Sequence, residues 1–175
     1  ASVQLLESPF RQAQETDLKY MLALDPDRLL APFLHEAGIA TQAKSYGNWE
    51  NTGLDGHIGG HYLSALSNMY AATKNAEVYR RLQYMTGWLD SCQRKNGDGY
   101  VGGVPGGKAM WQEIGKGKID AGSFSLNGKW VPLYNIHKTY AGLKDAWALA
   151  GVEEAKIVFL KLCDWFYQLT ASLTD

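Results

Sequence analysis

Residue types that bind sugars gather in one short stretch of the chain, residues 46–63. Trp49, Glu50, His57 and His61 stand there among several glycines. An indole ring stacks on the flat face of a ligand, imidazoles and carboxylates hydrogen-bond hydroxyl groups, and glycines let a backbone approach closely. Core packing does not require this mixture, so the stretch predicts a sugar-binding site.

A second cluster of similar chemistry occupies residues 130–138 and includes Tyr134, His137 and Lys138. Like the first, it leads into an apolar segment with helical spacing. Lys138 could contact a carboxylate or a ring oxygen of a ligand, and a lysine in the first turn of a helix is also commonly just solvated. The two clusters together are the candidates for chemistry in this chain.

Metal binding is a weaker interpretation of the same residues. His57 and His61 are four residues apart, the spacing by which one helix face presents two imidazoles to zinc. The glycines between them make a regular helix doubtful, no third ligand is indicated, and the glutamate of a His-Glu-x-x-His motif is absent. We therefore assign no metal ligand. Near a helix start the dipole disfavours the charged imidazoles, which leaves neutral donors and acceptors, and helix capping is the simpler role for either histidine.

Paired carboxylates for glycoside hydrolysis are not established by spacing. Glu50 and Asp55 could act as such a pair, but Glu113 and Asp120 are equally available. Hydrogen bonding to a substrate, or simple solvation in a loop, accounts for these acids equally well. No catalytic residue is assigned within the chain.

The elements that would position the two clusters are helices. Apolar residues recur at spacings of three and four, and no segment alternates as a strand does, which predicts an all-α fold. We expect helices over about 16–24, from Pro26 to about 37, from His61 to about 74, over 78–92, over 136–150 and over 155–169. Asp25 followed by Pro26 is typical of a helix start, and Gly151 of a helix end.

Two helical hairpins form a weak internal repeat. A shift of about 76 residues superimposes His61 on His137 and Ala65 on Ala141. Repeated helix pairs are typical of a bundle, a solenoid or a toroid. A Gly-rich stretch, residues 95–130, separates the hairpins with little helical pattern; we expect a long functional loop with a small β-hairpin over 123–130.

Composition narrows the class of protein. The 175 residues carry 17 basic and 18 acidic side chains, interspersed, for a formal net charge of −1, so no footprint for nucleic acid or an anionic membrane is visible. No apolar run is long enough for a membrane span. Hydrophobic residues make up 46% of the chain, enough for one globular domain. Cys92 and Cys163 lie in apolar helical stripes, which favours buried thiols over a disulfide.

With these residues in view, the chain resembles the β-L-arabinofuranosidase family of glycoside hydrolases, family 127. The resemblance is carried by residues 25–30, by Trp49-Glu50, by the Gly-His-x-x-Gly-His-Tyr-Leu block from Gly56 to Leu63, by residues 97–100, and by residues 134–138 with 141–143. It implies a wall of a sugar pocket made by Trp49, Glu50, His57, His61, Tyr100, Tyr134, His137 and Lys138.

The resemblance also implies an (α/α)₆ toroid, of which residues 1–175 form about half, the N-terminal portion of the catalytic domain. Similar proteins place a general-acid glutamate and a zinc-bound cysteine nucleophile beyond this region, so we expect zinc in the full-length protein and no cofactor in this chain. Uncovered helix faces would need the C-terminal half of the domain or a second copy of the chain, and the chain alone should be inactive.

The function expected from the resemblance is therefore a retaining exo-glycosidase that acts on L-arabinofuranose in plant glycans. The alternative is a non-catalytic helical-repeat module that binds carbohydrate or protein. Enzymes that trim plant glycans are often exported, so we expect the periplasm or the exterior rather than the cytoplasm.

Overall fold

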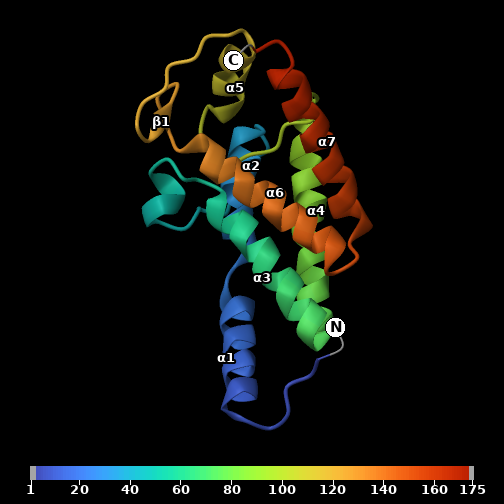
Figure 1. The fold of residues 1–175 in the computed structure, drawn as a ribbon. Coiled ribbons are helices and arrows are strands. Elements are labelled where there is room, and N and C mark those ends of the chain that lie inside the picture. Colours follow the sequence, from blue (N-terminus) through green and yellow to red (C-terminus); the bar gives the residue numbers. More distant parts are fainter. Residues whose placement is uncertain (1–2, 174–175) are drawn as a thin grey trace.

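The computed structural model describes residues 3–173 and is almost entirely helical (Figure 1). Within that range the α-helices are α1 (Pro9–Ala23), α2 (Pro26–Glu36), α3 (His57–Thr73), α4 (Ala76–Asn96), α5 (Gly107–Gly115), α6 (Pro132–Ala148) and α7 (Glu153–Thr170), with a 3₁₀ turn, η1 (Asn48–Asn51). A small antiparallel hairpin joins β1 (Ser125–Leu126) to β2 (Lys129–Trp130). The predicted all-α class is confirmed, whereas the expected domain limits, Ala1 and Asp175, lie outside the described residues.

Helix ends follow local capping chemistry. The Asp25 carboxylate accepts the Asp27 N–H at 2.9 Å, and Pro26 holds the first position of α2. At the start of α4 the Asn75 side chain accepts two amide N–H groups, and α4 ends at Gly97, which has φ of 82°. These ends agree with the sequence because the signals lie within a few residues of them.

The helix expected over about 16–24 is longer than predicted, because α1 begins at Pro9 after the Ser8 cap. Two further predictions about local structure were wrong. The helix expected to begin at His61 begins at His57, so the glycine pair at 59–60 lies inside α3. The Gly-rich stretch, expected to have little helical structure, contains α5, where Met110, Trp111 and Ile114 are buried. In both places tertiary burial supports a helix that local propensity alone would not favour.

The two helical hairpins pack side by side. In Figure 1, α3 and α6 lie side by side at the centre of the molecule, and α4 lies alongside α7. The start of α4 at Ala76 and the start of α7 at Glu153 are 77 residues apart, which matches the repeat seen in the sequence. Both hairpins bury one apolar face in a shared core that includes Leu63, Leu82 and Leu143. This pairing fits part of an α/α toroid.

The close packing of α3 against α6 depends on glycine. A Cβ atom at Gly60 would lie 2.7 Å from the backbone nitrogen of Thr139 and closer still to the carbonyl group of Lys138. On the other helix, a Cβ atom at Gly142 would lie 2.8 Å from Cβ of Leu63. The two backbones therefore approach each other at a distance that only glycine permits, and this contact brings the first turns of α3 and α6 together.

Large apolar side chains remain exposed on the outer helices. They include Phe10 and Tyr20 on α1 and Ile157, Leu160 and Tyr167 on α7. Among residues 3–173, no helix is both long enough and apolar enough to cross a membrane.

Candidate functional site

The first turns of α3 and α6 bring the two predicted clusters together. The ring of His57 lies 6.2 Å from that of Trp49, 6.0 Å from that of His61 and 6.2 Å from that of Tyr134, measured between centroids. These four rings form what we call the aromatic cluster. Residues from three separate segments of the chain thus meet at one place.

The outer members of the site are accessible and its centre is buried. Trp49 is 61% exposed and Tyr134 is 44% exposed, whereas His57 is only 2% exposed. His61 and His137 are also exposed. The indole and phenol rings can therefore stack on a ligand while the buried imidazole offers a fixed polar edge.

Lys138 borders the same cluster. Its Nζ atom lies 4.3 Å from the centroid of the Tyr134 ring, a cation–π contact within α6. The pKa of His61 is lowered, mainly by partial burial of its ring and further by the neighbouring cation Lys138. His61 is therefore neutral at pH 7 and can both donate and accept a hydrogen bond, as recognition of a hydroxyl group requires.

Glu50 is buried next to the cluster, and its carboxylate is engaged by neighbouring groups. Its side chain is only 3% exposed, and its carboxylate accepts the Gly56 and Ile58 amide N–H groups, each at 3.0 Å. Burial raises the pKa of Glu50, and the hydrogen bonds from the Ile58 and Gly56 N–H groups oppose the shift. The carboxylate is therefore held in place by its neighbours, and Glu50 also contributes to the lining of the surface hollow beside Trp49.

Tyr100 is the predicted site residue that the structure does not bring to the cluster. It is 1% exposed and packs against Trp165 of α7, with ring centroids 5.0 Å apart. Gly97 and Gly99, with φ of 82° and 95°, turn the chain so that Tyr100 points into the core. The local sequence from Gly97 to Tyr100 does not reveal the direction of the tyrosine side chain.

Asn135 supports the site and was not singled out in the sequence. It is 1% exposed, and its Nδ2 atom donates to the carbonyl oxygen of Asp55 at 2.9 Å. The bond ties the first turn of α6 to the loop that precedes His57. A lone asparagine between apolar residues in a helix's first turn is the only signal the sequence offers for this role.

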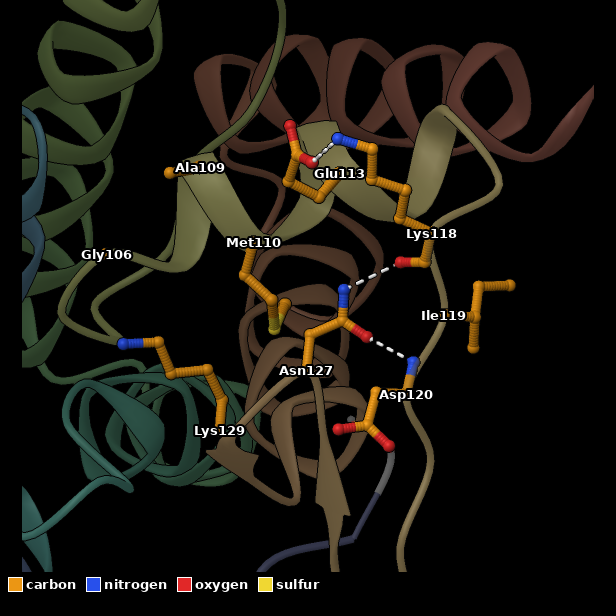
Figure 2. Close-up of a pocket in the computed structure, with 9 residues that line it drawn as sticks. All are labelled: Gly106, Ala109, Met110, Glu113, Lys118, Ile119, Asp120, Asn127 and Lys129. Carbon is orange, nitrogen blue, oxygen red and sulfur yellow. Dashed lines mark hydrogen bonds and ion pairs between the residues drawn. The ribbon is translucent and has the colours of Figure 1, made fainter.

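Two hollows lie at the surface near this end of the molecule. One, of about 610 Å³, is lined by Tyr46, Trp49 and Ile58 and adjoins the aromatic cluster. The other, of about 600 Å³, lies between α5 and residues 118–130 and shares no lining residue with the cluster (Figure 2). In it Glu113 pairs with Lys118 at 2.7 Å, and the Asn127 side chain bridges the backbones of Lys118 and Asp120. Its polar groups are thus largely occupied with one another.

The described residues do not make a zinc site. Across residues 3–173, no group of three or more histidine, cysteine, aspartate or glutamate side chains is arranged to hold a metal ion. His57 and His61 lack a third ligand, and Nδ1 of His57 is already engaged by Glu50 and Leu54.

The fold and the aromatic cluster together define an all-α domain in which histidines and exposed aromatic rings gather at the starts of α3 and α6. The family model described as Beta-L-arabinofuranosidase, GH127 catalytic domain, matches residues 2–175. The chain belongs to this family of glycoside hydrolases. A comparison with curated proteins gave no match.

Proposed function

We propose that this chain supplies one wall of the sugar pocket of a retaining, exo-acting β-L-arabinofuranosidase that removes L-arabinofuranose from plant glycans. The observation that carries the proposal is the aromatic cluster, because it lies at the helix ends of a domain that belongs to the GH127 family. The cluster offers one exposed indole for stacking and neutral imidazole edges for hydroxyl groups.

In this proposal the chain binds and orients the sugar and does not supply the reacting groups. Trp49 stacks on the face of the furanose ring, and His57, His61 and His137 hydrogen-bond its hydroxyl groups. The Glu50 carboxylate is engaged by two amide N–H groups and by His57, so it is not assigned as the general acid. We therefore expect the isolated 175-residue chain to bind the sugar without hydrolysing its glycosides.

The test is calorimetric titration of the chain with methyl β-L-arabinofuranoside, together with a hydrolysis assay. Trp49→Ala should weaken binding at least about tenfold, which corresponds to about 1.4 kcal/mol. Tyr167→Ala is the matched control, since Tyr167 is an aromatic residue that is 75% exposed on α7, away from the cluster. Equal affinities for the two variants would refute the stacking role.

A second measurement separates the enzyme from a non-catalytic binding module. The complete natural protein should release L-arabinose from aryl β-L-arabinofuranosides with the β configuration of the first product retained. Binding without release by that complete protein would favour the module.

A further inference from the structure

Glu50 makes one more contact than its structural position requires. Its Oε2 atom accepts the N–H of Gly56 and its Oε1 atom accepts the N–H of Ile58, so the carboxylate caps the N-terminus of α3. In addition, Nδ1 of His57 lies 2.6 Å from Oε1. Because an ionised carboxylate has only acceptors, three donors converging on it are accommodated without conflict.

A second glutamate shows what capping alone looks like. Glu36 of α2 caps α5 in the same way, accepting the N–H groups of Gly106 and Lys108 at 2.8 Å each. In both cases a remote carboxylate bridges the glycine that precedes a helix and the second helical residue. No histidine contact to Glu36 is found among residues 3–173, so a cap of this design does not need an imidazole.

The surroundings of His57 fix which of its ring nitrogens carries the proton. Nδ1 also lies 2.7 Å from the carbonyl oxygen of Leu54, a group that can only accept. Nδ1 is therefore the donor, and Nε2 of the neutral ring is left as an acceptor.

Nε2 of His57 remains available to a ligand. Among the described residues, the buried side-chain nitrogen and oxygen atoms that lack a partner are Oε1 of Gln93 and Oγ1 of Thr139. Among residues 3–173, the hydrogen bonds of the His57 ring are all made by Nδ1, and Nε2 has no protein partner. The ring lies amid those of Trp49, His61 and Tyr134.

We propose that Glu50 is a positioning residue that acts on the bound sugar through His57. Its carboxylate orients the imidazole and polarises it, so that Nε2 is a stronger and fixed acceptor for a sugar hydroxyl group. The inference rests on the proposed function, because it takes the ligand at the aromatic cluster to be an arabinofuranoside. It goes beyond the expectation that Glu50 is part of the wall of the sugar pocket.

The test is a double-mutant cycle on affinity for methyl β-L-arabinofuranoside. Glu50→Gln keeps the shape of the side chain and removes its charge, and it should weaken binding about tenfold, as removal of a partner that orients a functional histidine does. His57→Asn keeps a donor near the position of Nδ1 and removes Nε2. In the His57→Asn background, Glu50→Gln should cause no further loss, because the route through Nε2 is gone.

Glu36→Gln is the control for capping. It should lower stability by an amount similar to Glu50→Gln, since each disturbs one carboxylate cap, but leave sugar affinity unchanged. Proton–nitrogen correlation NMR of sugar-free protein with ¹⁵N-labelled histidine gives an independent readout. The proton on Nδ1 of His57 should resonate far downfield. It should move upfield in Glu50→Gln and keep its position in Glu36→Gln.

The outcomes are distinguishable. Additive losses in the cycle, or a Nδ1 proton that does not respond to Glu50→Gln, would overturn the positioning role while the sugar site stands. Absence of binding by the unaltered protein would refute the proposed function, and the inference with it.

Discussion

Replacement of Gly60 by alanine should separate α3 from α6 and disrupt the sugar site from a distance. The added Cβ atom would lie 2.7 Å from the backbone nitrogen of Thr139, whereas ordinary contact begins at 3.4 Å. Backbone atoms of a helix cannot turn aside as a side chain does, so α6 as a whole must move by at least about 0.7 Å, and by more to clear the closer carbonyl group of Lys138. His57 and His61 would then lie farther from Tyr134 and His137.

The energetic cost follows from two opposing terms. Alanine is favoured over glycine in a helix by about 1 kcal/mol. Overpacking of a well-packed contact typically costs about 1–3 kcal/mol, and a clash with backbone belongs at the upper end of that range. We therefore expect Gly60→Ala to lower the free energy of unfolding by about 2 kcal/mol.

Urea unfolding followed by circular dichroism measures this change, and titration with methyl β-L-arabinofuranoside measures the effect on the site. Gly87→Ala is the matched control, because Gly87 also lies inside a helix but its added Cβ atom would meet only Oε2 of Glu154, at 3.8 Å. That variant should gain up to about 1 kcal/mol and bind normally. If Gly60→Ala were as stable as Gly87→Ala and bound sugar equally well, the close contact of Gly60 with the backbone of α6 would not be required to position the site.

Three further changes test other parts of the structure. The Arg81 guanidinium donates hydrogen bonds to the carbonyl groups of Leu22 and Leu24 at the end of α1, so Arg81→Ala should lower the free energy of unfolding in urea by about 2 kcal/mol. Arg81→Lys, whose side chain lacks the planar guanidinium, should recover only part of that loss. Burial raises the pKa of Cys92 to about 12, so its thiol should stay protonated at pH 8. Iodoacetamide should therefore modify Cys92 only after urea unfolds the chain, and fast modification of the native protein would contradict this burial. The pKa of His61 is lowered from 6.5. Sugar affinity should therefore be constant from pH 8 to about pH 6.5 and fall only in more acidic solution, where His61 gains a proton. A loss of affinity between pH 8 and 7 that disappears in His61→Gln would refute the neutral state of His61.

The sequence was sufficient where a structural signal lies within a few residues of the structure it produces. Asp25 with Pro26, Asn75 and Gly151 mark helix ends through backbone hydrogen bonds and backbone angles that involve only their neighbours. The same holds for the apolar stripes of α4 and α7, whose spacing depends only on the helical repeat. The residue types in the two polar clusters and the motifs of the family were likewise visible in the sequence alone.

Only the tertiary structure decided which of these residues share a site. Trp49 and Glu50 are neighbours in the chain, yet one is exposed and the other is buried next to His57. Tyr100 is of a residue type that binds sugars, but two glycines with positive φ direct its side chain into the core. The physical reason is that burial and direction depend on contacts between distant segments, such as Gly60 of α3 against the backbone of α6, and a local pattern carries no record of its distant partner.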